Sequence, residues 1–302
     1  MGAVEVSVIG AGLMGGAIVE RLLKSGLRVC VYNRTVEKIK ELVKGGAEAI
    51  EVIDKAFIRQ GGIWILCLRD EASIIEVFSA IRKETLVDER LEGKIKALVV
   101  NTCTVGVKSS ERLERFFTDA DIQYVEMPVS GGVEGAKAGQ LIGYIGKMPQ
   151  LLRPQFGCVV KILLKDFCCM QSNTRAQAMK VINNYCESIH LLVAAEALVL
   201  AERFGIEKEM ISASLALGRG RSVYLELLLK RYMSQSRSLS VPIDIRIKDL
   251  ELAGDLFSEL EVPSLFYGHA YDLYTKVQTT DPKSTDQMEV YEHMLNLARR
   301  EI

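Results

Sequence analysis

Apolar residues in the first half of the chain form short continuous runs, and segments with a helical spacing of apolar positions separate them. Strands buried on both faces are continuously apolar, whereas a helix that faces a core repeats near every 3.6 residues. The alternation therefore predicts a doubly wound parallel sheet with right-handed crossovers. The predicted strands are Val4–Ile9, Arg28–Tyr32, Ile63–Leu68, Ile95–Val100 and Ile122–Glu126, and the predicted helices between them are Leu13–Lys24, Glu71–Ile81 and Val107–Phe117.

The pattern changes after Phe167. Before it, a glycine-rich segment precedes two predicted short strands, Leu141–Ile145 and Val159–Leu164, with a helix between them at Pro149–Phe156. After it, helical spacing predicts one long helix and five more, at Ala176–Gly205, Lys208–Leu217, Val223–Met233, Ile243–Leu260, Phe266–Lys276 and Thr285–Arg299. We therefore expect an α/β domain over residues 1–168 and an all-helical domain over residues 169–302, linked by the long helix.

The first predicted strand leads directly into a G-x-G-x-x-G motif. In such a motif the first glycine allows a tight turn, the second lets the backbone approach a pyrophosphate, and the third lets the helix pack on the strand. The N–H groups at the start of the following helix favour phosphate. Because the motif lies between a strand and a helix, it predicts a dinucleotide site rather than an ordinary glycine-rich turn. The residues of this site are Gly10, Ala11, Gly12, Leu13, Met14 and Gly15.

The end of the second predicted strand indicates which dinucleotide binds. NAD sites place an acidic residue there, about 20 positions after the glycines, to bind the ribose 2′-hydroxyl. Here the chain reads Asn33-Arg34-Thr35. A neutral Asn33 does not repel a 2′-phosphate, and the Arg34 guanidinium matches its geometry. We therefore expect NADP rather than NAD; the alternative is a solvated arginine followed by a threonine that caps a helix.

Lys180 and Asn184 lie four residues apart in the long predicted helix, so they share one face. A lysine in a cleft is desolvated, which lowers its pKa and lets it exchange a proton near neutral pH. Such a lysine could protonate an alkoxide or deprotonate a hydroxyl, while Asn184 donates and accepts hydrogen bonds. Upstream, Ser130-Gly131-Gly132 offers a hydroxyl and successive N–H groups to a carboxylate. The alternatives are a solvated helix lysine and a loop ahead of a helix.

Composition narrows the possible partners. The net charge of −1 gives no reason to expect nucleic acid or an anionic membrane surface. No apolar run reaches bilayer length and no signal segment precedes the first strand, so we expect a cytoplasmic protein without a membrane partner. The seven cysteines form no C-x-x-C pair and the three histidines show no ligand spacing, which predicts reduced cysteines and no metal site.

Three segments resemble motifs of the β-hydroxyacid dehydrogenase family. Met127-Pro128-Val129-Ser130-Gly131-Gly132 is similar to the family's substrate motif, Lys180-Val181-Ile182-Asn183-Asn184 to its catalytic K-x-x-N-N, and Lys248-Asp249-Leu250 to its K-D-L element. The resemblance implies a Rossmann domain, a long interdomain helix and an all-helical domain. It also implies NADP-dependent hydride transfer between nicotinamide and a small β-hydroxy acid or its semialdehyde, as in 3-hydroxyisobutyrate dehydrogenase and glyoxylate/succinic semialdehyde reductase.

By the same resemblance, Lys180 and Asn184 are catalytic, Ser130, Gly131 and Gly132 bind a carboxylate-bearing substrate, and Leu68, Thr104 and Lys248 contact the cofactor. The chain departs from the family pattern at several positions: Thr174 and Ala176 replace glycines, Leu68-Arg69-Asp70 lacks a proline, and Cys103 replaces a serine. An imine reductase of the same fold and a non-catalytic NADP-binding relative remain as alternatives, and the presence of Lys180 disfavours both.

The long helix is more apolar than one partner domain could cover. The resemblance to the β-hydroxyacid dehydrogenases also implies a helical domain that makes a dimer or a larger assembly. We therefore expect a homodimer or a homotetramer in which this helix is buried.

Overall fold

A computed structural model describes residues 5–53, 57, 61–78, 97–150, 152–234, 240–280 and 285–300. The chain divides into two compact units, Met1–Lys180 and Val181–Ile302. The division falls inside helix α8 (Asn173–Arg203), whereas the sequence-based boundary at 168/169 lies ahead of this helix. Helix α8 therefore belongs to both units.

The first unit contains a six-stranded sheet in which every paired strand is parallel to its neighbour. The strand order is β3-β2-β1-β4-β5-β6, so the order reverses between β1 and β4, where ligands bind in sheets of this kind. The predicted doubly wound fold is thereby confirmed. The strands are β1 (Glu5–Ile9), β2 (Arg28–Tyr32), β3 (Glu48–Ala49), β4 (Gly62–Leu66), β5 (Ala97–Asn101) and β6 (Gln123–Glu126).

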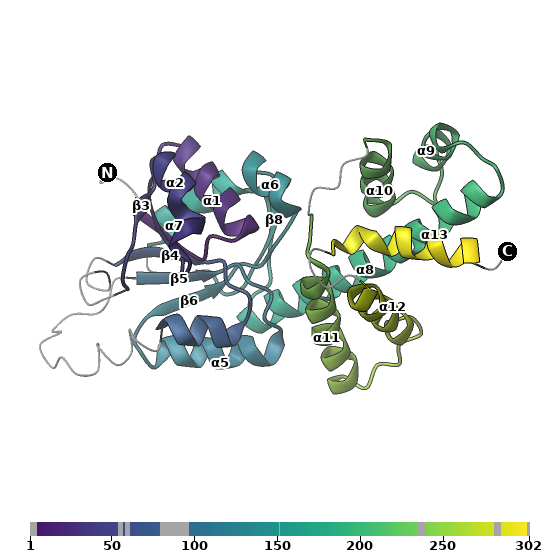
Figure 1. The fold of residues 1–302 in the computed structure, drawn as a ribbon. Helices are drawn as coiled ribbons and strands as arrows, with labels where there is room; N and C mark the ends of the chain where they lie inside the picture. The colour runs from purple at the N-terminus through teal and green to yellow at the C-terminus, as the bar shows by residue number, and fades with distance from the viewer. Residues whose placement is uncertain are drawn as a thin grey trace, which may run out of the picture. The chain divides into compact units, whose positions relative to one another are not determined.

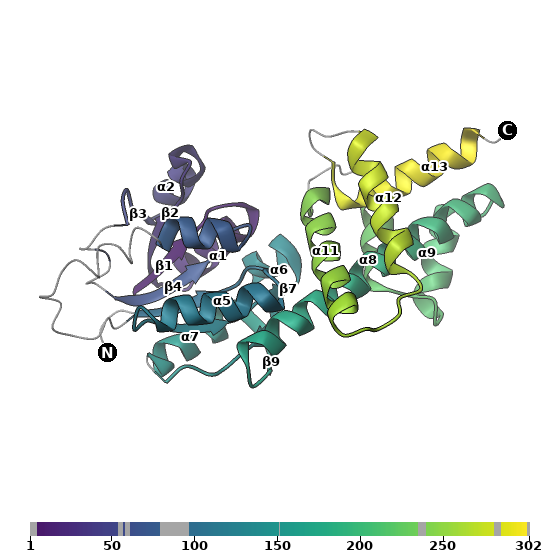
Figure 2. The same cartoon turned by 90° about the horizontal axis from the view of Figure 1, so that it is seen from below.

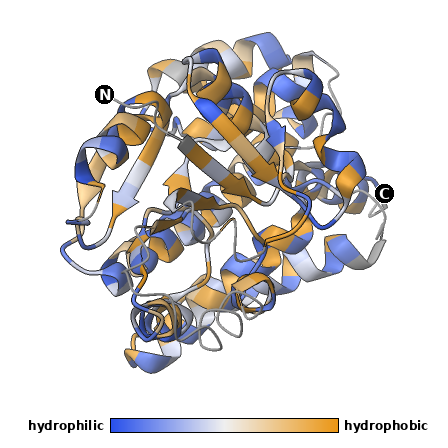
Figure 3. Ribbon diagram, turned by 90° about the vertical axis from the view of Figure 1, so that its left-hand side faces the viewer, coloured by the Kyte–Doolittle hydropathy of each residue, from blue (hydrophilic) through white to orange (hydrophobic). Residues whose placement is uncertain are grey.

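Helices cover both faces of this sheet (Figure 1), and the side chains of β4 and β5 alternate between two apolar cores. In β4, Ile63 and Ile65 face one core, while Trp64 and Leu66 face the other. The strands are correspondingly apolar, whereas the helices that cover them carry polar outer faces (Figure 3). The first core includes α1 (Leu13–Lys24), α6 (Gly132–Ala138) and α7 (Arg153–Leu163); the second includes α5 (Val107–Thr118) and the helical residues 71–78. The first unit also contains the short helices η1 (Val36–Ile39) and α2 (Lys40–Lys44).

A second, three-stranded sheet contains β7 (Val129–Ser130), β8 (Leu141–Ile145) and β9 (Leu164–Cys169). Strand β7 is antiparallel to β8, and β9 is parallel to it. The predicted strand at Val159–Leu164 is wrong, because Val159–Leu163 form the end of helix α7 and Leu164 already begins β9. The buried residues of α7 explain this: Phe156, Val159, Val160 and Leu163 follow the i, i+3, i+4, i+7 spacing of a helix face.

The second unit is all helical within the described residues. It holds the second part of α8 together with α9 (Lys208–Leu217), α10 (Val223–Met233), α11 (Ile243–Glu259), α12 (Tyr267–Thr280), η2 (Gln287–Glu289) and α13 (Val290–Arg300). Figures 1 and 2 show α11 and α12 side by side. Apolar residues of α8, such as Leu191 and Leu198, pack in one core with Leu225 and Leu228 of α10. The predicted helices of this unit are therefore confirmed. In other predicted elements, Val4 and residues 79–81, 95–96 and 151 lie outside the described residues.

Helix α8 corrects one expectation about membranes. By length and composition it is apolar enough to cross one, with a mean hydropathy of 1.2 over its most apolar 18 residues, of which 39% are buried. This is weak evidence, since core helices of soluble proteins pass the same test. Here the helix contributes Leu191, Ala195 and Leu198 to the core of the second unit.

Candidate functional site

The glycine motif after β1 forms a cradle with one open position. A Cβ on Gly10 would lie 2.3 Å from the Cys67 carbonyl oxygen, and one on Gly15 would lie 1.9 Å from the Gly10 carbonyl oxygen. These two glycines therefore let the glycine loop and helix α1 pack closely against Cys67, directly after the end of β4. A Cβ on Gly12, in contrast, would meet no atom within 4 Å. This open space at the N-terminus of α1 fits the pyrophosphate of a dinucleotide.

Asn33 connects the glycine loop to the loop after β2. Its Oδ1 accepts a 2.9 Å hydrogen bond from the Ala11 N–H, and its Nδ2 donates a 2.9 Å bond to the Thr35 carbonyl. Thr35 occupies the N-cap of η1 but makes no side-chain capping bond, unlike the alternative considered above. The Arg34 side chain is 82% exposed and forms a 3.3 Å ion pair with Glu76. Because exposed pairs contribute little stability, another anion can displace Glu76 from this guanidinium.

The loops after β4 and β5 carry Leu68 and Thr104, both half-buried. Cys103, at the position where the family prefers serine, accepts a hydrogen bond from the Leu68 N–H through its Sγ at 3.1 Å. The loop after β5 is also bonded to helix α8, because Gln177 Oε1 accepts the N–H groups of Val105 and Gly106. Leu68 and Thr104 therefore lie on connected loops at the same edge of the sheet as the glycine motif.

The segment Ser130-Gly131-Gly132 leads from β7 into α6. Gly131 and Gly132 have φ angles of 124° and 66°, which side chains rarely adopt, so the turn depends on both glycines. A Cβ on Gly132 would lie 3.4 Å from Glu134 Oε2. An anionic ligand at this turn would therefore meet N–H groups and also a like charge, unless the Glu134 side chain moves.

Lys180 is only 7% exposed and lies on helix α8, the N-terminal part of which is bonded to the strand ends by amide side chains. Gln177, one turn before it, donates to Glu126, and Asn173 Oδ1 accepts the Glu126 N–H. The two departures from the glycine pattern are accommodated here. Ala176 is fully buried, and the Thr174 hydroxyl bonds that of Ser172 at 3.1 Å.

In the second unit, Asp249 brings Asn184 and Lys248 together. The Asn184 Nδ2 donates to Asp249 Oδ2 at 2.6 Å, and the Lys248 Nζ donates to Oδ1 at 2.8 Å. The three side chains are largely buried, with Asn184 5% and Asp249 4% exposed. The contact that the structure gives for Lys248 is thus an internal ion pair, and its predicted role at the cofactor stays a prediction.

Sequence reasoning missed four polar residues of these networks: Glu126, Gln177, Arg246 and Asp249. Asp249 belongs to the K-D-L segment, and Gln177 lies three residues before Lys180, so their spacing was a usable signal. Arg246, which is 1% exposed and donates to the Asn184 carbonyl, had no such signal.

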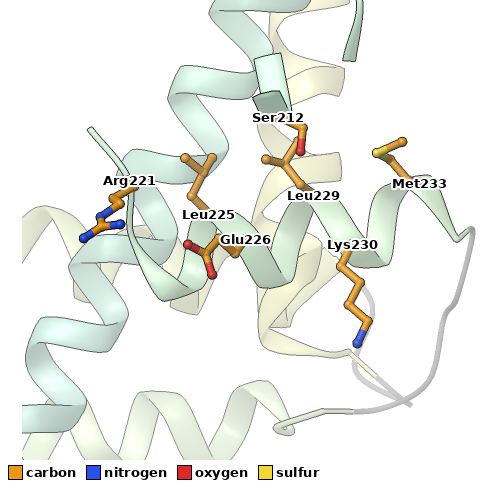
Figure 4. A pocket seen from close by; sticks show the side chains of 7 residues that line it. All are labelled: Ser212, Arg221, Leu225, Glu226, Leu229, Lys230 and Met233. Carbon is orange, nitrogen blue, oxygen red and sulfur yellow. The ribbon is translucent and has the colours of Figure 1, made fainter. Parts of the chain in front are cut away.

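The small cavity in Figure 4 contains none of the predicted site residues. It has a volume of about 160 Å³ and is lined by Ser212, Arg221, Leu225, Glu226, Leu229, Lys230 and Met233. Lys230 points away from Ser212, so the polar groups do not converge on one ligand. Among the described residues, no group of three or more His, Cys, Asp or Glu could hold a metal ion, and all seven cysteines are free.

Two family models match most of the chain. Residues 5–153 match the NAD binding domain of 6-phosphogluconate dehydrogenase. Residues 174–294 match a model described as NAD-binding of NADP-dependent 3-hydroxyisobutyrate dehydrogenase. The first match contains the glycine cradle, and the second contains Lys180, Asn184 and Lys248.

Individual relatives are distant but extend over nearly the full length. The chain is 27% identical to glyoxylate/succinic semialdehyde reductase 1 of Arabidopsis thaliana, covering 91% of this chain and 93% of the relative. It is 25% identical to 2-(hydroxymethyl)glutarate dehydrogenase of Eubacterium barkeri, covering 86% and 85%. Among solved structures, Psf3 in complex with NADP+ and 2-OPP matches with a TM-score of 0.85 at 28% identity, covering 96% of this chain and 99% of that one.

Proposed function

This chain belongs to the 3-hydroxyisobutyrate dehydrogenase family of β-hydroxyacid dehydrogenases, and we propose that it is an NADP-dependent oxidoreductase acting on a small β-hydroxy acid or its semialdehyde. The observation that carries the proposal is a buried lysine on a helix bonded to the loop after β5. That loop lies at the same edge of the sheet as the open space beside Gly12. A proton-transferring group and a nucleotide cradle thus belong to the same unit.

In this proposal Lys180 is the general acid and base. A nicotinamide dinucleotide held by the glycine loop Gly10–Gly15 would supply or accept the hydride. For reduction, the Lys180 ammonium polarises the substrate carbonyl and gives a proton to the oxygen; for oxidation, the neutral amine removes the hydroxyl proton. Asn184, one helical turn further along α8, orients the same oxygen with its amide, and Asp249 fixes the orientation of that amide through its 2.6 Å hydrogen bond.

The substrate class follows from Ser130, Gly131 and Gly132. Two glycines with positive φ present backbone N–H groups next to a serine hydroxyl, a combination that binds carboxylates. Glu134 at the same turn limits how much negative charge the site tolerates, which favours a small substrate with one carboxylate there.

Oxidation of NADPH, followed by its absorbance, tests the proposal. Glyoxylate, succinic semialdehyde and methylmalonate semialdehyde are offered separately, and the corresponding hydroxy acids are offered with NADP for the reverse reaction. We expect saturable turnover with at least one of them. Tight NADPH binding without turnover on any of the three would contradict the enzymatic assignment and favour a non-catalytic nucleotide-binding relative.

The cofactor preference depends on Arg34 in this proposal. The Arg34→Gln variant should bind NADPH about 10- to 100-fold more weakly, because a charge-assisted bond to the 2′-phosphate is lost. Binding of NADH should change by less than about twofold, since it has no such phosphate. Fluorescence titration of both cofactors measures the effect, and Arg28→Gln, which removes another exposed ion pair of the sheet, is the matched control. Equal losses for NADPH and NADH would contradict this role.

We also propose that the helical unit assembles with a second copy of the chain. Val193 and Leu200 on the second part of α8 are 57% and 73% exposed, and Phe204, directly after the helix, is 84% exposed. Together they form an apolar surface that the unit itself leaves uncovered. Light scattering at micromolar concentration should give at least about twice the chain mass of 33.5 kDa. Phe204→Glu should shift the mass toward the monomer, whereas Val36→Glu in the first unit should not. A monomeric wild-type protein would contradict the proposal.

A further inference from the structure

We propose that Gln177, held by the buried carboxyl group of Glu126, is the positioning residue that fixes Lys180 relative to the loop after β5. This inference rests on the proposed function, because it assigns Lys180 the chemistry described above. The Gln177 side chain is fully buried and donates to the Cys103 carbonyl and to the Glu126 carboxyl group.

The Gln177 amide uses its full hydrogen-bonding capacity. Its Oε1 accepts the N–H groups of Val105 at 3.0 Å and Gly106 at 3.2 Å. Its Nε2 donates to the Cys103 carbonyl at 2.8 Å and to Glu126 Oε2 at 2.7 Å. A flipped amide would bring N–H groups against N–H groups, so the neighbours determine one orientation. The amide therefore joins helix α8 to both sides of Thr104.

Glu126 holds the other end of this arrangement. Its carboxyl group is fully buried at the end of β6 and accepts hydrogen bonds from the Tyr124 hydroxyl and from Asn101 Nδ2 as well as from Gln177. Its backbone N–H donates to Asn173 Oδ1 at 3.0 Å. Asn173 and Gln177 are four residues apart on α8, so both lie on one helix face and bond the same residue.

Lys180 follows Gln177 by three residues and thus shares this face of the helix. A rotation or slide of α8 that moved Lys180 would have to break the hydrogen bonds of Gln177 and Asn173. Transfer of a proton requires the reacting atoms to be placed closely, and a shift of about 1 Å can reduce a rate about 100-fold. The four bonds of Gln177 therefore hold the lysine at a set distance from the loop that carries Thr104.

The protonation of Glu126 provides a signature of this arrangement. Burial raises the pKa of the Glu126 carboxyl to about 7, although the hydrogen bonds from Tyr124, Gln177 and Asn101 lower it. The groups that face it are Tyr124 on β6, Asn101 on β5, Gln177 on α8 and Ser110 on α5, all neutral near that pH. At a pH below this pKa, the Glu126 group that accepts from Gln177 is a neutral carboxylic acid, which binds the amide more weakly than a carboxylate does.

The Gln177→Met variant keeps the length of the side chain and removes all four hydrogen bonds. We expect kcat to fall about 10- to 100-fold, with KM for the substrate and the dissociation constant of NADPH within about threefold of wild type. A purely structural role would lower the melting temperature and leave kcat of the folded enzyme unchanged. The exposed Gln140→Met is the matched control and should leave kcat unchanged. A well-folded Gln177→Met enzyme with wild-type kcat would overturn the proposal.

Hydrogen exchange tests the arrangement independently of activity. The amides of Val105 and Gly106 should exchange faster in Gln177→Met than in the wild type, because Oε1 no longer holds them. If the wild-type enzyme lacks turnover, the proposed function fails, while unchanged exchange at these two amides shows that the positioning proposal itself is wrong. Should Gln177→Met not fold, Glu126→Gln provides the test. It keeps an acceptor for Gln177 and should abolish an inflection of kcat near pH 7; retention of that inflection would overturn the proposal.

Discussion

Replacing Lys180 with methionine is expected to reduce kcat by a factor of about 10²–10⁴, the usual contribution of a general acid or base. Methionine is close to lysine in length and fits a site that is only 7% exposed, so the loss would report chemistry rather than a cavity. The dissociation constant of NADPH should stay within about threefold, because the phosphate-binding loops follow β1 and β2. Stopped-flow oxidation of NADPH and equilibrium fluorescence measure the two quantities separately.

Two further variants make the Lys180 experiment decisive. Lys180→Arg keeps a positive charge but does not release a proton near neutral pH, so it should be nearly as impaired as the methionine variant. Lys161→Met on α7 removes an exposed lysine and is the matched control. If Lys180→Met retained turnover within about threefold of wild type, general acid–base catalysis by this residue would be refuted.

Replacing Arg246 with methionine should destabilise the second unit by about 3–5 kcal/mol, as is usual when one partner of a buried ion pair is removed. The Arg246 guanidinium is 1% exposed and donates to the Asn184 carbonyl at 3.0 Å, Glu187 Oε2 at 3.1 Å and the Tyr224 hydroxyl at 2.9 Å. Its Nε and Nη2 also donate to Gln287 Oε1 at 2.8 and 2.6 Å. One side chain thus joins α8, α10, α11 and η2, and its loss removes the guanidinium that pairs with the Glu187 carboxylate at 3.1 Å.

Urea unfolding followed by circular dichroism measures the effect of the Arg246 substitution on the free energy of unfolding. Arg28→Met is the control, because it breaks an ion pair in which both side chains are more than half exposed, and it should cost no more than about 1 kcal/mol. An Arg246→Met protein less than about 1 kcal/mol below wild type would mean that the network contributes little to stability.

Much of the fold could be predicted because its strands are short apolar runs with helical segments between them. Strand β4 is an example, since its continuous apolar sequence reflects burial on both faces of the sheet. Helix α7 was misassigned because a short apolar run, Val159–Leu164, has the same appearance in a buried strand and in a helix end. Strand β3 is only two residues long, too short for any periodicity to be visible.

The candidate site was predictable only where its residues form local motifs. The glycine loop and the Lys180–Asn184 spacing are short and carry recognisable patterns. Glu126 and Gln177, in contrast, are 51 positions apart, and the sequence around either residue contains no motif that would predict the hydrogen bond between them. The sequence predicts a role for Asn33 at the cofactor. The hydrogen bond that its Oδ1 accepts from the Ala11 N–H joins residues far apart in the chain, so it could not be predicted from local sequence either.

The open space at Gly12 has a consequence for how such a chain tolerates change. Alanine at Gly10 or Gly15 would place a Cβ against a backbone carbonyl oxygen, so the surrounding backbone would have to move. Alanine at position 12 would meet no protein atom within 4 Å. Within one six-residue segment, Gly12 thus leaves room for the nucleotide, whereas Gly10 and Gly15 are needed for the packing of the protein itself. A homologue that lost nucleotide binding through a substitution of Gly12 would still fold and could take on another function.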